Sequence, residues 1–142
     1  MRFKAIPAVF LVLQKENKLL LQRRLHSGWE DGKYTFVSGH VEENETPIQA
    51  IIRETKEEIG ITVREKDLKA VHFMYRKGTD TARMDIYFTC STWQGEIQNM
   101  EPDKHDDIAW FEIDTLPQNT TQIVKFFLEK LKKKEIYSEF GW

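Results

Sequence analysis

A helix with well-marked ends, between Thr46 and Gly60, constrains this chain more than any other feature. Thr46 is a preferred N-cap residue, Pro47 suits the first helical position, and Gln49 can complete a capping box. Gly60 can adopt the left-handed conformation that ends many helices. Between these ends, one side of the helix is predicted to pack on a core. Its residues are Ile48, Ile51, Ile52, Thr55 and Ile59.

The same helix carries three closely spaced glutamates, Glu54, Glu57 and Glu58. Like charges at helical spacing cost roughly 0.2–0.5 kcal/mol per pair, and anions in the last turn oppose the helix dipole. Hard divalent cations take oxygen ligands, so the cluster indicates a metal site. A solvated acidic face is the alternative, and for three glutamates alone it is the better explanation. Arg53 is expected to reach Glu57, one turn away.

The spacing of the surrounding residues favours the metal site. Gly39 is followed after five residues by Glu45, and after seven more by the run from Arg53 to Ile61 (RETKEEIGI). The order and spacing of these residues resemble the signature of the Nudix hydrolases. That signature reads G-x5-E-x7-R-E-U-x-E-E-x-G-U, where U is bulky and apolar. Every fixed charged residue and both glycines match. Thr55 departs from the apolar residue usual in the family, but it lies on the core-facing side and leaves the carboxylates intact.

The resemblance implies a reaction and a set of metal ligands. Nudix hydrolases cut a pyrophosphate bond in a nucleoside diphosphate linked to a group X, with Mg²⁺ or Mn²⁺ bound to the helix carboxylates. In this chain the expected ligands are Glu54, Glu57, Glu58 and the backbone carbonyl of Gly39. Arg53 is expected to orient one glutamate through a salt bridge. Because the acidic face is expected to be exposed, Glu57→Gln or Glu58→Gln is predicted to abolish hydrolysis and leave the fold nearly intact.

The same resemblance implies a general base and residues that bind the substrate. Glu54 is the first candidate for the general base, and Glu101 is its rival. Glu101 begins an acidic loop, residues 101–107, for which a solvated turn is the alternative explanation. Arg24 is expected to bind the substrate, since guanidinium groups suit phosphate, although a basic surface position explains it equally well. Trp29, in the following loop, can stack on a base.

Hydrophobic periodicity predicts a mixed arrangement of strands and helices. Strands are expected at 8–13, 19–24, 34–37, 63–75, 83–93 and 108–111, and a second helix at 121–134. Regular alternation of strand and helix is missing, so the predicted fold class is α/β, with a mixed β-sheet sandwiched between helices. The Nudix resemblance implies the same fold. The aromatic tail, residues 137–142, is expected to pack on the domain, line the substrate pocket or meet a partner subunit.

Length and composition predict the number of domains, the kind of partner and the cellular location. A chain of 142 residues is predicted to form one domain over residues 1–142. Its net charge of −2 argues against a surface that coats nucleic acid. Cys90 is the only cysteine, which favours the cytoplasm. The apolar run near the N-terminus is too short to cross a membrane. The chain is expected to bind a small nucleotide and to bind neither a membrane nor nucleic acid. It is expected to be a monomer or a homodimer.

Two functions from different classes fit these features. The first is Mg²⁺-dependent hydrolysis of a nucleoside or deoxynucleoside triphosphate, including damaged nucleotides. The small size of the chain favours such substrates over ADP-ribose, nucleoside diphosphate sugars, dinucleoside polyphosphates or capped RNA. The second is a nucleotide-sensing module that has lost catalysis, against which the complete set of Arg53, Glu54, Glu57 and Glu58 argues. A metal-binding acidic protein without a nucleotide ranks third.

Overall fold

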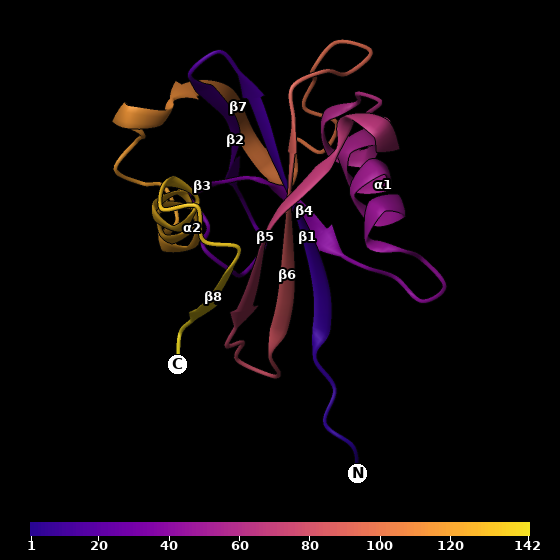
Figure 1. The fold of residues 1–142 in the computed structure, drawn as a ribbon. Helices are drawn as coiled ribbons and strands as arrows, with labels where there is room; N and C mark the ends of the chain where they lie inside the picture. Colours follow the sequence, from indigo (N-terminus) through magenta and orange to yellow (C-terminus); the bar gives the residue numbers. More distant parts are fainter.

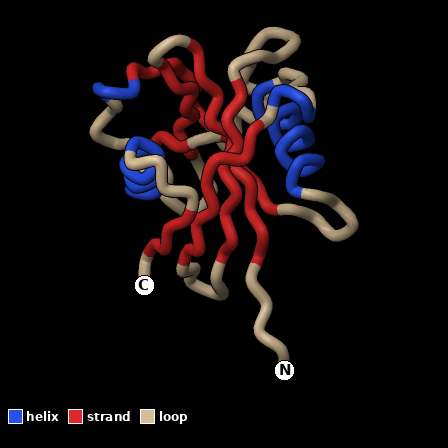
Figure 2. Tube along the Cα trace, in the orientation of Figure 1, coloured by secondary structure: helices blue, strands red, loops and turns tan.

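The computed structural model describes residues 1–142 and contains a mixed β-sheet with a helix packed on each side (Figure 1). Helix α1 (Pro47–Ile59) covers one face and helix α2 (Gln122–Lys132) the other. Figure 2 shows the strands fanned between the two helices. The predicted fold class is therefore confirmed. Neither helix has the length and apolar character needed to cross a membrane.

Eight strands form the sheet, in the order β3-β2-β1-β6-β5-β8, with β4 paired to β1 and β7 paired to β2. The β1–β6 and β5–β8 pairs are parallel, and the other pairs are antiparallel. Two short 3₁₀ turns, at Glu65–Asp67 and Ile113–Thr115, complete the structure. The strands are β1 (Ile6–Lys15), β2 (Lys18–Arg24), β3 (Tyr34–Thr35), β4 (Val37–His40), β5 (Lys69–Arg76), β6 (Arg83–Cys90), β7 (His105–Glu112) and β8 (Tyr137–Phe140).

Strand β1 holds the two halves of the core together. Its side chains alternate, so that Ala8, Phe10 and Val12 pack beneath α2, and Val9, Leu11 and Leu13 pack beneath α1. All six are buried, as expected for a continuous apolar run covered on both faces. The strand also pairs with β4, where Val9 lies opposite Gly39. This pairing fixes the segment that leads into α1.

The packing of α1 follows the predicted apolar side. Ile51, Thr55 and Ile59 are fully buried, and Ile48 and Ile52 pack partly buried against the same core. The hydroxyl of Thr55 donates to the backbone carbonyl of Ile51 at 2.6 Å. A buried hydroxyl needs such a partner, so the helix itself accommodates the departure from an apolar residue.

Several boundaries differ from the prediction. The strand expected at 63–75 begins only at Lys69, after the 3₁₀ turn at Glu65–Asp67, and the strand expected at 83–93 ends at Cys90. The strand expected at 34–37 is divided at Phe36 into β3 and β4, which pair with different neighbours. The loop expected at 101–107 ends at His105, where β7 already begins to pair with β2. The prediction of a loop over residues 105–107 was therefore wrong, because long-range pairing with β2 extends the strand.

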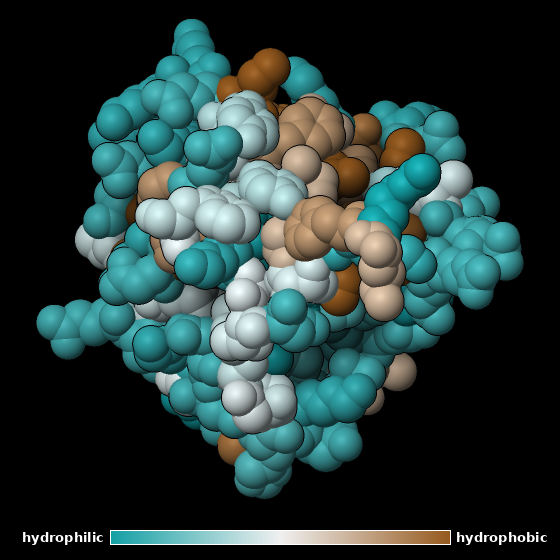
Figure 3. All heavy atoms as spheres, turned by 90° about the horizontal axis from the view of Figure 1, so that it is seen from below, coloured by the Kyte–Doolittle hydropathy of each residue, from teal (hydrophilic) through white to brown (hydrophobic).

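The C-terminal tail packs on the domain as β8, parallel to β5. Both ring nitrogens of buried His72 lie within hydrogen-bond distance of this segment, 2.8 Å from the carbonyl of Glu135 and 2.7 Å from Ser138 Oγ. The indole of Trp142 stacks on Tyr75 with the ring centroids 5.4 Å apart. Both termini lie at this end of the molecule, and the view from this end shows apolar side chains among the polar ones (Figure 3).

Candidate active site

The two ends of α1 are fixed by the predicted capping groups. Thr46 Oγ1 accepts from the backbone N–H of Gln49 at 3.2 Å, and Gln49 Oε1 accepts from the N–H of Thr46 at 2.9 Å. Gly60 has a φ of 77°, in the left-handed region. Because both ends are fixed, the register of the glutamates on the helix is also fixed.

Arg53 connects the glutamates of the helix to the loop before it. Its guanidinium donates to both carboxylate oxygens of Glu45, at 2.7 and 3.0 Å, and to Glu54 Oε1 at 2.8 Å. It also reaches Glu57 Oε2 at 3.2 Å, as predicted for residues one turn apart. This bonding lowers the pKa of Glu45 to about 2 and raises the pKa of Arg53. One arginine therefore positions three carboxylates.

Gly39 lies directly against the carboxylate of Glu54. A Cβ atom at this position would come within 2.7 Å of Glu54 Cγ and would overlap the carboxylate carbon. Real Cβ atoms do not approach other atoms so closely, so the glycine provides the space that the Glu54 side chain occupies. The first glycine of the Nudix signature thus has a physical role in this chain, independent of any metal.

Gly39→Ala is expected to displace the Glu54 carboxylate and lower kcat by about 10²-fold, with a smaller effect on the overall fold. The steric conflict involves a side chain, while the β1–β4 pairing that holds the backbone stays in place. Activity and thermal unfolding of the variant, measured beside Gly28→Ala, test this. Gly28 has open space around its Cα, although its positive φ adds a local strain. Equal activity losses in the two variants would contradict the role of Gly39.

Glu58 is buried, and the prediction that it forms part of an exposed acidic face was wrong. Only 5% of the residue is exposed, whereas the side chain of Glu57 is 51% exposed. The side-chain amide of Gln22, on β2, donates to Glu58 Oε1 at 2.5 Å. Burial, followed by the neighbouring Glu54 carboxylate, raises the pKa of Glu58 well above its ordinary value. The strand and the loop that cover the helix end could not be inferred from helical spacing.

The chain segment before β7 completes the site. The N–H of Met100 donates to the carbonyl of Glu58 at 3.1 Å, which ties this segment to the end of α1. A tight turn follows, in which the N–H groups of Lys104 and His105 both donate to the carbonyl of Glu101, at 2.9 and 3.0 Å. The turn brings the side chains of Glu101 and His105 toward the buried Glu58.

Burial changes the pKa of both side chains in this turn. It raises the pKa of Glu101, an effect that the nearby Lys104 partly offsets. Burial, followed by the positive charges of Arg24 and Lys104, lowers the pKa of His105 to about 4. The imidazole is therefore neutral near pH 7.

A polar pocket of about 230 Å³ lies where these elements meet. It contains the three candidate ligand carboxylates of α1 and two cationic side chains, Arg24 and Lys104. The Nε–H of Arg24 donates to the carbonyl of Trp29 at 2.8 Å, and its guanidinium lies over the indole ring, 4.9 Å from the centroid. The lining residues are Arg24, Ser27, Ser38, Glu54, Glu57, Glu58, Glu101, Lys104 and His105.

The structure brings together five of the seven residues that the sequence singled out. Arg24, Glu54, Glu57, Glu58 and Glu101 line the pocket, whereas Gly39 and Arg53 lie behind it and contact Glu54. Sequence reasoning missed the roles of Ser38, Lys104, His105 and Gln22. Only Gln22 has a sequence signal, because two-residue periodicity places this polar residue on the same side of its strand as Leu20 and Arg24.

The donor set suits a hard divalent cation. Four carboxylates meet in one pocket, and Oε2 of Glu58 is buried without a hydrogen-bond partner. Buried polar atoms are nearly always satisfied, so an unpartnered carboxylate oxygen indicates that a cation completes the site. Oxygen ligands of this kind suit Mg²⁺ and Mn²⁺.

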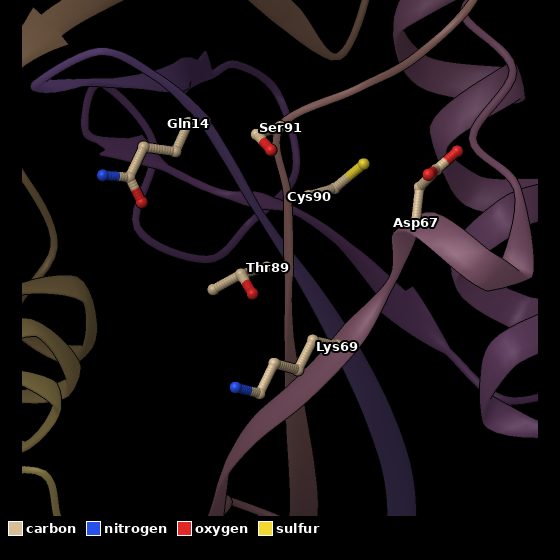
Figure 4. A pocket seen from close by; sticks show the side chains of 6 residues that line it. All are labelled: Gln14, Asp67, Lys69, Thr89, Cys90 and Ser91. Atoms are coloured by element: carbon tan, nitrogen blue, oxygen red, sulfur yellow. The ribbon is translucent and has the colours of Figure 1, made fainter.

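A second pocket, of about 260 Å³, lies away from these glutamates (Figure 4). It is formed where β1 and β6 end and β5 begins, and it is lined by Gln14, Asp67, Lys69, Thr89, Cys90 and Ser91. It contains a single carboxylate, and the Cys90 thiol is occupied by a hydrogen bond to the carbonyl of Thr92. It therefore lacks the donors of a metal site.

Comparison with known proteins agrees with this geometry. The sequence model of the NUDIX domain matches residues 4–131. The chain belongs to the Nudix family. In this Nudix chain, Glu54, Glu57 and Glu58 of the family signature line the polar pocket, and Gly39, Glu45 and Arg53 form the contacts behind it.

Several curated relatives resemble this Nudix chain at moderate identity. The NAD-capped RNA hydrolase NudC of Vibrio vulnificus is 30% identical over 116 residues, which cover 80% of this chain and 41% of that protein. The ADP-ribose pyrophosphatase of Methanocaldococcus jannaschii is 29% identical, over 79% of this chain and 66% of that protein. The 8-oxo-dGTP diphosphatase of Escherichia coli is 30% identical, over 67% of this chain and 68% of that protein. The chain thus spans about two fifths of the NudC relatives.

Solved structures show the same fold. The MutT NUDIX hydrolase of Burkholderia pseudomallei superposes with a TM-score of 0.82 at 23% identity, covering 90% of this chain and 98% of that one. The MutT protein of Methanosarcina mazei Go1 gives a TM-score of 0.79 at 20% identity, covering 94% of this chain and 97% of that one.

Proposed function

We propose that this protein hydrolyses a pyrophosphate bond in a nucleoside diphosphate linked to a group X, with Mg²⁺ or Mn²⁺ as cofactor. The observation that carries the proposal is the pocket in which Glu54, Glu57, Glu58 and Glu101 face the cations Arg24 and Lys104. Carboxylates that bind metal, beside cations that bind phosphate, are the groups that phosphoryl transfer requires. The three relatives described above bear names that denote hydrolysis of nucleotides or nucleotide caps.

Each side chain has a proposed role. Glu54, Glu57 and Glu58, with the carbonyl of Gly39, hold divalent cations, which neutralise negative charge on the phosphate oxygens. Arg53 orients Glu54 and its neighbours through the salt bridges described above. These roles apply to residues 1–142 acting as one domain.

The groups that act on water and phosphate are also proposed. Glu54 is the first candidate to take the proton of the attacking water, since Arg53 and Gly39 fix its carboxylate. Glu101 is the rival, because it lines the same pocket and burial raises its pKa. Arg24 and Lys104 bind phosphate oxygens with charged donors.

A nucleoside or deoxynucleoside triphosphate, including a damaged one, is the proposed substrate. The match to the 8-oxo-dGTP diphosphatase covers about two thirds of both chains, which favours a small nucleotide. The match to the ADP-ribose pyrophosphatase makes ADP-ribose the second candidate. A sensor without catalysis is disfavoured, because a binding module has no need for the complete set of carboxylates. A cytoplasmic location remains a prediction from the single cysteine.

The test is a product-release assay with a panel of nucleotides, at alkaline pH with and without Mg²⁺. The panel includes the common and the oxidised triphosphates, ADP-ribose, a nucleoside diphosphate sugar, a dinucleoside polyphosphate and an NAD-capped RNA. Products identify the bond that is cut, since pyrophosphate, phosphate and nucleoside monophosphate are distinguishable. Mg²⁺-dependent cleavage of one panel member supports the proposal. Specific nucleotide binding without any cleavage supports the sensor instead.

Arg24→Ala is expected to raise KM for the nucleotide roughly 10–100-fold, the equivalent of losing a hydrogen bond to a charged group. Arg23→Ala is a matched control, because adjacent strand residues point to opposite faces and Arg23 pairs with Asp106 outside the pocket at 2.7 Å. Steady-state kinetics of both variants test the assignment. An equal change in KM for the two variants would refute a specific role for Arg24.

A further inference from the structure

His105 is a buried imidazole in the metal-binding pocket that none of the roles above uses. Only 5% of the residue is exposed, and it lies at the first position of β7, paired with Arg24 of β2. Its backbone is held on both sides, since its N–H donates to the carbonyl of Glu101 and its own carbonyl accepts from the Asn99 side-chain amide at 2.6 Å. The backbone of His105 is therefore held in place.

The imidazole has no hydrogen-bond partner in the protein. Nδ1 is buried and unpartnered, and Nε2 lies 3.9 Å from Glu58 Oε1, which is too far for a hydrogen bond. Oε2 of Glu58 is buried and unpartnered as well. Buried polar atoms without a partner are costly unless another species satisfies them.

The separation of two of these atoms fits ligands of one metal ion, and the third atom lies close by. One ligand atom each from Glu58, Glu101 and His105 lies within 4.8 Å of the other two. Nitrogen and carboxylate ligands sit about 2.0–2.2 Å from a first-row divalent metal, so two ligands of one ion lie no more than about 4.4 Å apart. The separation of 3.9 Å between His105 Nε2 and Glu58 Oε1 falls within this limit.

We propose that His105 is a nitrogen ligand of a divalent metal that Glu58 and Glu101 also bind. The inference rests on the proposed function, because it adds a ligand to the metal site of the same pocket. Imidazole suits first-row transition metals, of which Mn²⁺ is the weakest binder, better than it suits Mg²⁺, so the site favours Mn²⁺ over Mg²⁺. Lys104, whose Nζ is 3.7 Å from Glu101 Oε2, is exposed and can move aside at little cost.

The decisive measurement is the electron spin-echo modulation of Mn²⁺ bound to the purified protein without nucleotide. A coordinated imidazole nitrogen produces a ¹⁴N modulation, which is expected in the wild type and lost in His105→Gln. His40→Gln is the matched control and is expected to keep the modulation, since His40 lies near Glu54 but outside the pocket. The ratio of Mn²⁺ to Mg²⁺ affinity, measured by calorimetry, is expected to fall about tenfold in His105→Gln and to stay constant in His40→Gln.

The wild-type spectrum keeps the proposal testable even if His105→Gln does not fold. Mn²⁺ binding without ¹⁴N modulation overturns the inference and leaves the proposed function standing. Modulation that persists in a folded His105→Gln variant also overturns it, because the nitrogen then comes from another residue. If Mn²⁺ does not bind at all, both the inference and the metal site of the proposed function fail.

Discussion

Glu58→Gln is expected to lower Mg²⁺-stimulated hydrolysis by about 10³-fold, the scale seen when one electrostatic contact to a transition state is removed. When a cation is bound, the substitution takes away the negative charge of one of its ligands and changes little else. Glutamine retains an oxygen that can accept from Gln22, whose amide reaches Glu58 Oε1 at 2.5 Å. The shape of the buried side chain is preserved, so a loss of activity reports the loss of the charge.

The same substitution is expected to stabilise the metal-free protein at neutral pH. The folded-state pKa of Glu58 is raised above its unfolded value, mainly by burial. A raised carboxyl pKa costs stability above the unfolded pKa. This cost is full above the folded pKa, shrinks as the pH falls below it, and is gone below the unfolded pKa. Glutamine carries no charge to bury, so Tm should rise by about 2–4 °C for each kcal/mol relieved.

Thermal unfolding with and without Mg²⁺ separates the two effects. A ligand at 100 times its Kd stabilises the folded state by about 2.7 kcal/mol, so Mg²⁺ should raise the Tm of the wild type. This increase should be much smaller in Glu58→Gln. Glu43→Gln is the control, because Glu43 is exposed in the loop before α1 and lies outside the pocket. A Glu58→Gln variant with wild-type activity and an unchanged response to Mg²⁺ would refute the metal-ligand assignment.

The helix and its chemistry could be predicted because the information is local. Thr46, Gln49 and Gly60 fix the ends of α1 through contacts within a few residues, and the sequence contains all of them. The spacing of Arg53 and Glu57 likewise determines their contact. The fold class followed from the absence of regular alternation between strands and helices.

Burial and strand pairing could not be predicted, because they depend on distant segments. Spacing on a helix treats Glu57 and Glu58 as equivalent neighbours, yet β2 and the segment before β7 cover only Glu58. The pairing of β2 with β7 joins residues more than 80 positions apart and moves His105 from a loop into a strand. The tail becomes β8 through contacts with His72, which lies more than 60 positions away.

Arg53→Ala is the second substitution for which a large effect is expected. kcat should fall by about 10²-fold, and the free energy of unfolding should fall by about 1.5–3 kcal/mol, as for a lost hydrogen bond to a charged group. The guanidinium is the only group that bonds Glu45, Glu54 and Glu57 together. Without it the Glu54 carboxylate is no longer fixed against Gly39, and it repels its neighbours.

Arg53→Lys distinguishes orientation from charge. An ammonium keeps the positive charge but lacks the planar fork that reaches both oxygens of Glu45 and also Glu54. Lysine should therefore recover much of the lost stability and little of kcat. Glu42→Gln is the control, since Glu42 also lies 3.0 Å from Arg53 but its side chain is 62% exposed, where ion pairs contribute about 0–1 kcal/mol. If Arg53→Lys restored kcat fully, charge alone would account for the role of Arg53, and the positioning of Glu54 by a forked donor would be wrong.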